Sequence, residues 1–383
     1  MTKLFRRNLI LVLVCAFAGL FVPKLASAQL PADQMTTLKL GDPTPEWVYV
    51  LDVQFPVLSS KVWIIDGATN KMLGQVSSGY VANFEVSPDH KELYTADTFY
   101  SRGWRGDRND FITIFDAHTL QVTGEVAIPP KRLLIISKRN VTAVTPDGKF
   151  LLISNMTPAT SVSVVDLKAR KFAGEIDTTG CTQVLVGGNR RFSSICADGA
   201  MLSVTINDKG KEVGRKRSPQ LFDPDKDPLF DQPAMAGGMI FFDSYHGQIL
   251  PIDISGEQAA AQPAWSVLGD ADKGWRPGGW QTIAASADGS KLYVLMHQGG
   301  EWTHKQFGKE VWVFDAKTHQ RLEKITLTTP GYSIRVTNEP KPLLFNLILA
   351  PEPKLETYAS ADGKWTLRST FKDFLSPFLL YGP

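Results

Sequence analysis

Apolar and polar residues alternate along most of the chain with the two-residue period of β-strands. Several of these strands end in an aspartate and are followed by a polar turn. The copies of this pattern are residues 62–66, 111–116, 162–166 and 311–315, with a weaker one at 249–253. The aspartates that end the first three copies, Asp66, Asp116 and Asp166, are fifty residues apart. A β-pattern repeated at this period predicts a propeller.

A second motif, an Asp-Gly or Asp-His turn between two strands, falls between these copies. It occurs in residues 87–94, 145–152 and 286–293, with a shorter version at 361–365. Glycine accepts the positive φ that tight hairpin turns require. Each unit therefore contains four strands, which is the composition of a propeller blade. The 355 residues after Ala28 hold seven such units, so we expect an all-β, seven-bladed β-propeller.

The first 28 residues have the pattern of a cleaved export signal. Two arginines precede an apolar run at 9–22, and small residues at 26–28 form a cleavage site. The apolar run is too short to span a bilayer comfortably, and no other stretch approaches eighteen apolar residues. We therefore expect a periplasmic protein cleaved after Ala28, with no membrane segment and with residues 29–383 forming a single propeller domain.

Removal of the signal takes Cys15 away and leaves two cysteines, Cys181 and Cys196. An even pair in an oxidising compartment favours a disulfide. The alternative is a redox-active dithiol, which usually has two residues between its sulfurs, whereas fourteen separate this pair. We expect a structural bridge between two strands of one blade, with Cα atoms about 4.4–6.8 Å apart.

Composition and motifs argue against several classes of function. A net charge of +2 gives no reason to expect nucleic-acid binding. The chain lacks the Gly-x-Ser-x-Gly elbow, the P-loop and the dinucleotide glycine motif. His297 and His304 flank a loop with Glu301, but their spacing matches no standard zinc pattern. We therefore expect no catalytic residue and no metal site in this chain, and a recognition function carried by its loops.

Several segments resemble the heavy chains of amine dehydrogenases. Those similar to methylamine dehydrogenase heavy chains are 101–110, 274–281, 303–305, 314–318 and 341–344. Those closer to the aralkylamine (aromatic amine) branch are 128–132, 155–161 and 227–230. Cys181 and Cys196, followed by Asp198 and Gly199, match the heavy-chain disulfide of the family. The resemblance covers nearly all of the chain after residue 28.

The resemblance implies a non-catalytic, seven-bladed heavy chain in an α2β2 heterotetramer with a small, cysteine-rich light (β) chain. The cofactor of the family, tryptophan tryptophylquinone, belongs to the light chain. This chain is therefore expected to carry no cofactor, and its own Trp275 and Trp280 are expected to be structural. The implied reaction is the oxidative deamination of a primary amine to an aldehyde and ammonia. Electrons then pass to a small blue copper protein of the azurin or amicyanin type.

The resemblance implies a direct role for one position. In the family, a phenylalanine of the first blade reaches the light-chain active site and shapes the substrate channel. Phe55 fits this motif, with a one-residue difference in its spacing to Asp66, and packing between blades is the alternative role. The chain departs from the family after 341–344, where residues 345–354 run almost directly from one strand into the next. We therefore expect a shortened or lost hairpin and an incomplete last blade.

Two other functions remain open from the sequence. The chain could be a stand-alone periplasmic propeller that binds a ligand or a protein, or a hydrolytic propeller of the lactonase kind. A heavy subunit requires an apolar patch on one face that is larger than a monomer normally exposes. A hydrolase requires carboxylates or histidines with perturbed pKa values in the central tunnel.

Overall fold

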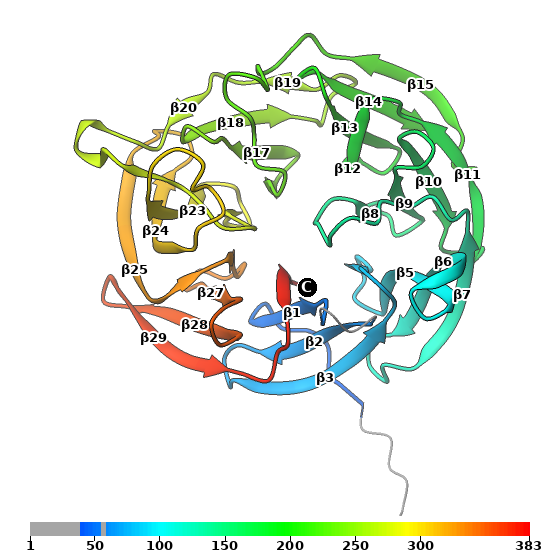
Figure 1. The fold of residues 1–383 in the computed structure, drawn as a ribbon, viewed down its shortest axis with the longest axis horizontal. Coiled ribbons are helices and arrows are strands. Elements are labelled where there is room, and N and C mark those ends of the chain that lie inside the picture. The colour runs from blue at the N-terminus through cyan, green and yellow to red at the C-terminus, as the bar shows by residue number, and fades with distance from the viewer. Residues whose placement is uncertain (1–38, 55–58) are drawn as a thin grey trace, which may run out of the picture. The chain divides into compact units, whose positions relative to one another are not determined.

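The strand pattern forms seven antiparallel sheets in the described part of the chain, residues 39–54 and 59–383 of this computed structural model (Figure 1). The sheets stand around a central axis as the blades of a β-propeller, so the expected all-β, seven-bladed fold is confirmed. The expected export signal, residues 1–28, and Phe55 lie outside the described residues. Within those residues the only helix is the short 3-10 helix η1 (Asp270–Asp272), and no helix is long and apolar enough to cross a membrane.

Each of the first four blades has four strands within the described residues. The first blade contains β1 (Trp47–Asp52), β2 (Ser60–Asp66) and β3 (Lys71–Ser78), with β30 (Pro377–Tyr381) as its innermost strand. From the axis outward, the second blade contains β4 (Asn83–Val86), β5 (Glu92–Arg102), β6 (Arg105–Asp116) and β7 (Val122–Ile128). The third contains β8 (Thr142–Val144), β9 (Phe150–Asn155), β10 (Ser161–Asp166) and β11 (Lys171–Asp177). The fourth contains β12 (Cys181–Gly188), β13 (Arg191–Cys196), β14 (Met201–Ile206) and β15 (Glu212–Arg217).

The outermost strand of the fifth blade and the innermost strand of the sixth blade are each split in two. The fifth contains β16 (Ala234–Ala236), β17 (Met239–Asp243) and β18 (Gln248–Asp253), and both β19 (Ala260–Ala261) and β20 (Trp265–Ser266) pair with β18. In the sixth, β21 (Trp275–Pro277) and β22 (Ile283–Ala285) both pair with β23 (Lys291–Gln298), followed by β24 (Gly308–Asp315) and β25 (Arg321–Gly331). The seventh contains β26 (Ser333–Val336), β27 (Leu343–Ile348), β28 (Lys354–Ala361) and β29 (Lys364–Phe371).

The last blade has four strands, so the hairpin that was expected to be shortened or lost is present. β27 and β28 are joined by a short turn at 349–353, and they pair along their whole length, from Leu343 with Ala359 to Ile348 with Lys354. The hairpin is retained because every residue of β27 is buried in the core, so the strand is needed even though its turn is short. The C-terminal tail supplies both β29 and the closing strand β30.

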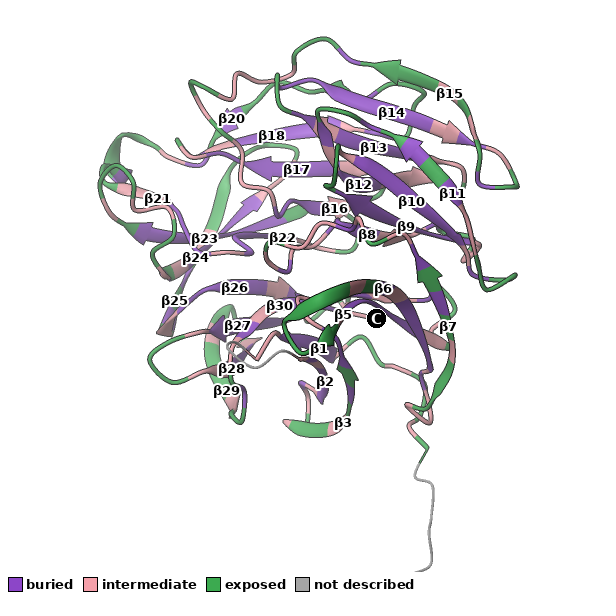
Figure 2. Ribbon diagram, turned by 45° about the vertical axis from the view of Figure 1, so that its right-hand side comes forward, coloured by how far each residue is buried: buried purple, intermediate pink, exposed green. Residues whose placement is uncertain are grey.

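Apolar side chains pack between the sheets and hold the blades together. Every residue of β1 is buried, whereas the outermost strand β15 is mostly exposed, and Figure 2 shows this gradient from inner to outer strands. Between the first two blades, the ring of Phe84 lies 5.3 Å from those of both Tyr49 and Tyr381. Because the inner strands are buried on both faces, their sequences are nearly continuous apolar runs.

The aspartates that recur every fifty residues shape turns. Asp66 Oδ1 accepts hydrogen bonds from the backbone N of Ala68 and Thr69, at 2.8 and 3.1 Å. Asp116 accepts one from Thr119 N at 2.7 Å, and its hydrogen bonds with Thr119 hold the pKa of the Asp116 carboxyl below its usual value. The fifty-residue repeat of aspartates therefore reflects the hydrogen bonds that stabilise the turns between the third and fourth strands of the blades.

The connections between strands divide between two faces of the propeller. This follows because the innermost strands run parallel from blade to blade, as the parallel bridge between Gln281 and Ser333 illustrates. We call one side the turn face, which carries the Asp-Gly turns between first and second strands and the turns between third and fourth strands. The other is the loop face, which carries the connections between second and third strands and those between successive blades. The connection from β1 to β2, which contains Phe55, begins on the loop face.

A buried carboxylate fixes the closure of the ring on the loop face. Asp52, at the end of β1, is fully buried and accepts hydrogen bonds from the backbone N of Leu375 and Ser376, at 2.9 and 2.7 Å. It also accepts one from Trp63 Nε1 at 3.3 Å and one from Gln54 N at 3.1 Å. The segment that leads into β30 and the start of the β1–β2 connection therefore share one anchor.

Removal of this anchor should destabilise the whole ring. Asp52→Ala leaves several buried or half-buried donors without an acceptor, at about 1–3 kcal/mol each, so the free energy of unfolding should fall by about 3 kcal/mol or more. Urea unfolding measures the loss. The control is Asp89→Ala, which removes an exposed turn carboxylate and should cost about 1 kcal/mol. Equal losses in the two variants would contradict the special role of Asp52.

Candidate functional site

Exposed apolar side chains mark one face of the propeller. Among the described residues, eleven large apolar side chains are exposed. Five lie on the outermost strands of blades, namely Met72, Val122, Val213, Leu322 and Leu367. The other six lie in connections or strand ends of the loop face, namely Phe99, Trp104, Ile135, Met156, Trp302 and Leu375. The first five come one from each of five blades, and four of them stand at the turn-face ends of their strands. The loop face carries the other six and is the candidate binding surface.

The β5–β6 hairpin projects from the loop face. Its two strands pair as far as Arg102 and Arg105, beyond the ends of the neighbouring strands β4 and β7. Gly103 turns the chain with a φ of 73°, a conformation that residues with a Cβ disfavour. Trp104 follows at the tip and is 73% exposed. The hairpin therefore carries a large apolar ring away from the body of the propeller.

A buried network of polar side chains holds the root of this hairpin. Arg108 donates to both carboxylate oxygens of Asp110, at 2.9 and 2.8 Å. Arg132 donates from its backbone N to Asp110 at 3.2 Å and from Nε to Thr98 Oγ1 at 2.9 Å. Its guanidinium also donates to two backbone carbonyls in the connection before β4. Because these buried groups satisfy one another, the hairpin stands on a rigid base.

A cavity of about 510 Å³ opens on the loop face and is lined by residues that precede β16 or lie in the β17–β18 and β23–β24 connections. We call it the aromatic recess, after the five aromatic rings in its wall, Phe230, Tyr245, His246, Trp302 and His304. The Tyr245 ring lies 5.9 Å from that of Trp302 and 5.5 Å from that of His304. Trp302 is 77% exposed, so the recess has an accessible apolar rim.

Two imidazoles near the recess, His297 and His304, have lowered pKa values. Burial lowers the pKa of His297 to about 4, and the nearby Arg276 guanidinium lowers it as well. Burial also lowers the pKa of His304. His297 packs so closely that a Cβ on Gly278 would lie 2.3 Å from its Nδ1, which explains a glycine at this position. In the described part of the chain, no three His, Cys, Asp or Glu side chains are grouped to hold a metal ion.

A second cavity, of about 450 Å³, lies beside the recess on the loop face. The two cavities share four lining residues, Pro224, Pro228, Leu229 and Phe230. Its remaining wall includes both cysteines and Ile195 of the fourth blade. The shared segment therefore connects the fourth blade to the aromatic recess along one largely apolar depression.

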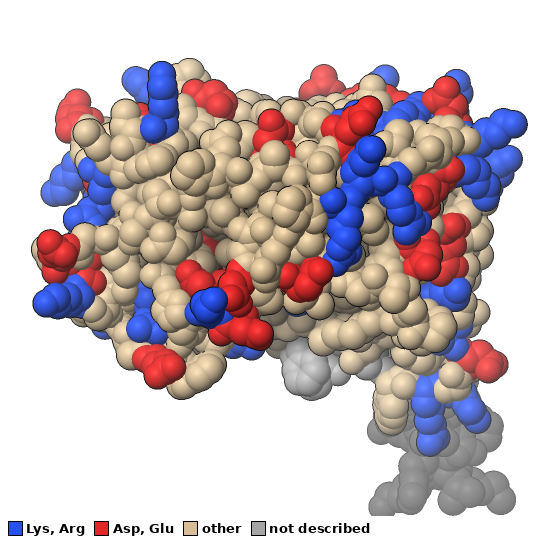
Figure 3. Space-filling view, turned by 90° about the horizontal axis from the view of Figure 1, so that it is seen from above, with Lys and Arg blue, Asp and Glu red and all other residues tan. Residues whose placement is uncertain are grey.

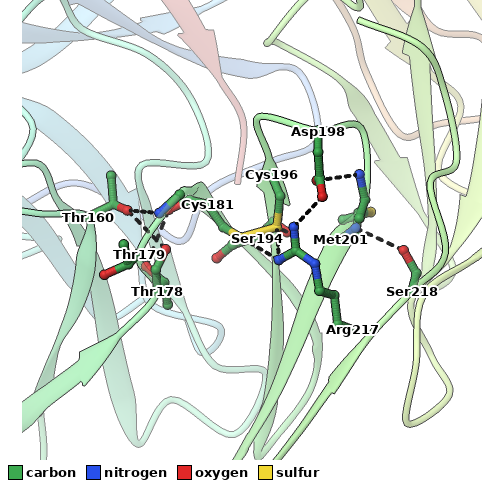
Figure 4. The surroundings of a disulfide bond; sticks show 12 residues. Thr160, Thr178, Thr179, Cys181, Ser194, Cys196, Asp198, Met201, Arg217 and Ser218 are labelled. Carbon is green, nitrogen blue, oxygen red and sulfur yellow. Dashed lines mark hydrogen bonds and ion pairs between the residues drawn. A yellow bond between two sulfur atoms is a disulfide. The ribbon is translucent and has the colours of Figure 1, made fainter.

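Cys181 and Cys196 are joined by a disulfide between β12 and β13, at the loop face (Figure 4). Their Cα atoms are 3.9 Å apart, closer than the range expected from the sequence. The reason is that the two residues face each other directly as a pair without mutual backbone hydrogen bonds, where antiparallel strands approach most closely. Arg217 Nη1 lies 3.4 and 3.2 Å from the two sulfurs, and its Nη2 donates to Asp198 at 2.7 Å.

The sequence located parts of this surface and missed others. Trp275 and Trp280, expected to be structural, pack at 5.3 Å from Trp312 and 6.1 Å from Tyr332. The aromatic recess was not anticipated, because its rings come from separate connections with no shared spacing. The available signals are the segments 227–230 and 303–305, which resemble the family and supply Phe230 and His304 to the recess.

These features define the class of protein. It is a β-propeller that presents an apolar surface on one face. Solved structures share the fold at low identity. A dihydro-heme d1 dehydrogenase superposes with a TM-score of 0.55 at 15% identity, covering 90% of this chain and 67% of that one. A putative 6-phosphogluconolactonase from Bacteroides fragilis superposes with a TM-score of 0.57 at 12% identity, covering 91% and 99%. At these identities the likeness shows the fold alone.

Sequence comparison identifies the family. The family model of the methylamine dehydrogenase heavy chain matches residues 45–370. The methylamine dehydrogenase heavy chain of Methylorubrum extorquens is 32% identical over 337 residues, which are 86% of this chain and 82% of that protein. The heavy chain of Methylobacillus flagellatus is 31% identical over 323 residues, 83% and 80% of the two chains. The chain belongs to the methylamine dehydrogenase heavy-chain family.

Loss of the disulfide should lower stability by a predictable amount. The bridge closes a loop with a sequence separation of 15, and a loop of this size stabilises by about 3 kcal/mol through the unfolded chain. The double variant Cys181→Ser with Cys196→Ser should lose about this much in urea unfolding. The control is wild-type protein unfolded in a strong reductant, and its free energy of unfolding should equal that of the double variant. Free thiols labelled in exported protein without prior reduction would contradict the bridge.

Proposed function

We propose that this chain is the heavy, non-quinone subunit of a periplasmic amine dehydrogenase, and that its light chain binds the loop face. The observation that carries the proposal is the gathering of six of the eleven exposed large apolar side chains of the described residues on this one face. Such a surface is costly to leave in water and is typical of a protein interface. Membership of the methylamine dehydrogenase heavy-chain family supports a light chain as the partner.

In this proposal the light chain supplies the tryptophan tryptophylquinone, and the assembly is an α2β2 heterotetramer. The reaction is the oxidative deamination of a primary amine to an aldehyde and ammonia, with electrons passed to a small blue copper protein. This chain contributes no reacting group. Its work is to hold the light chain in place and to shape the entrance for the amine.

The aralkylamine branch is the proposed specificity, and the position of three segments supports it. Residues 128–132 contain Arg132, which anchors the β5–β6 hairpin. Residues 155–161 contain Met156, one of the six exposed apolar side chains of the loop face. Residues 227–230 line the aromatic recess. All three segments that resemble the aralkylamine branch thus lie on the loop face, where a branch-specific light chain and substrate would be recognised.

The exposed tryptophans are the proposed centres of the interface. Tryptophan is enriched among the residues that dominate binding energies, because its large ring loses much water contact on burial. Trp104 stands on the rigid hairpin, and Trp302 stands at the rim of the aromatic recess. The two rings come from the second and sixth blades, so a partner that covers both spans the central axis.

The test is light-chain binding by single variants. Trp302→Ser and Trp104→Ser should each weaken the affinity for the mature light chain by about 30-fold or more, the effect of losing about 2 kcal/mol at an interface centre. Isothermal titration calorimetry measures the affinity, and urea unfolding checks that both variants remain folded. The control is Leu322→Ser, which removes an exposed apolar side chain from the outermost strand β25 and should leave the affinity unchanged.

Two results would overturn the subunit proposal. One is wild-type chain that fails to bind the mature light chain, which would leave the propeller as a stand-alone binding protein. The other is amine-dependent dye reduction by protein that is free of light chain, because the proposal places the quinone on the partner.

Phe55 is the proposed residue of this chain at the substrate entrance, on the family resemblance. Phe55→Ala should shift the ratio of kcat/KM between aromatic and small aliphatic amines, by roughly 10- to 200-fold at most, because a pocket change of a few methylenes is worth this much. Electron transfer to the copper protein should be unchanged. If Phe55 packs between blades instead, the variant would lose about 3–5 kcal/mol of stability with unaltered selectivity.

A further inference from the structure

The central channel holds a cavity at its turn-face end that the proposed function does not use. Its volume is about 340 Å³. Its wall is formed by the inner strands β16, β22 and β26 and the turns that follow them, and by Arg139, which precedes β8. Residues from the third, fifth, sixth and seventh blades meet only at the axis, so the cavity lies in the channel, at the end opposite the apolar loop face.

Two arginines contribute to this wall. Arg335 lies on β26, and Arg139 extends to the ring of Tyr381 on β30, 5.9 Å from its centroid. Arg335 packs on the backbone just after β30, where a Cβ on Gly382 would lie 1.8 Å from its Nη2. A glycine is therefore required here for the guanidinium to keep its place. The closing strand thus brings both cations to the same cavity.

No carboxylate pairs with Arg335 among the described residues. Arg335 Nε is buried and has no hydrogen-bond partner among the described residues. Burial lowers the pKa of Arg335 to about 9, and the charge of Arg139 lowers it as well, so the guanidinium is still charged at pH 7. The carboxyl group near Arg139 is Glu85, and burial raises its pKa to about 8. The raised pKa weakens Glu85 as a counter-charge for Arg139.

Both arginines are partly buried, and two like charges that line one cavity repel each other where water screens them incompletely. We propose that Arg139 and Arg335 form a binding site for a small oxyanion, a carboxylate or a phosphate, in the central channel. Guanidinium groups match the oxygens of both anions in a two-pronged hydrogen bond, and both arginines line the cavity. The bound anion would link the third and seventh blades across the closing strand.

The test uses inorganic phosphate and acetate with the purified protein in its native assembly. Each anion should raise the melting temperature in a saturable way, beyond the effect of sodium chloride at the same ionic strength. Isothermal titration calorimetry should show one site per heavy chain, and the stronger of the two ligands identifies the anion class. Arg335→Gln should weaken binding at least 10-fold, and Arg335→Lys should weaken it too, because lysine keeps the charge without the planar fork.

The matched control is Arg368→Gln, which removes an exposed arginine from β29 of the same blade and should leave anion binding unchanged. Arg139→Gln provides a second variant if the Arg335 substitutions prevent folding, and it should also weaken binding at least 10-fold. Equal responses of the wild-type protein to chloride, phosphate and acetate would overturn the proposal. Wild-type affinity in Arg139→Gln and Arg335→Gln would overturn it as well.

Discussion

The pairing of β30 with β1 is the contact on which the rest of the propeller depends. The hydrophobic core of a propeller lies between neighbouring sheets, and no blade buries its apolar side chains alone. Each blade is therefore stable only when both neighbours are in place. Tyr49, Val50 and Leu51 pair with Tyr381, Leu380 and Leu379, and the paired residues are almost wholly buried. Asp52 then binds the backbone just before β30. Closure of the ring therefore combines strand pairing, apolar burial and one buried carboxylate.

Buried polar groups support two parts of the loop face. The β1–β2 connection starts at Asp52, and the β5–β6 hairpin stands on Asp110 and Arg132, so both grow out of buried and satisfied polar groups. Binding of a partner by such a surface loses little side-chain and backbone freedom, which favours affinity for a given contact area. Charged side chains of both signs are interspersed around the side of the propeller in Figure 3, in contrast with the apolar side chains of the loop face.

The sequence predicted what depends on local periodicity and missed what depends on assembly. Alternation and Asp-Gly turns predict blades, because a turn and its flanking strands are determined by neighbouring residues. The last hairpin is hard to recognise in the sequence, because a short turn at 349–353 resembles a missing one. The burial of Leu343 to Ile348 shows that the strand is kept. The distance between Cys181 and Cys196 was overestimated because register is not visible in spacing. Tyr245 and Trp302 meet through blade packing, which no local pattern records.

The two ends of the channel differ in their physical chemistry, and the closing strand connects them. Residues 372–376 run along the loop face to Asp52, and the same strand ends at Tyr381 and Gly382, against Arg139 and Arg335. An apolar face favours a macromolecular partner, whereas two arginines that line one cavity favour a small anion. Because the anion would bridge blades on both sides of the closure, its binding would stabilise the ring without touching the light-chain surface. Stability and partner recognition are then separate properties of opposite ends of one channel.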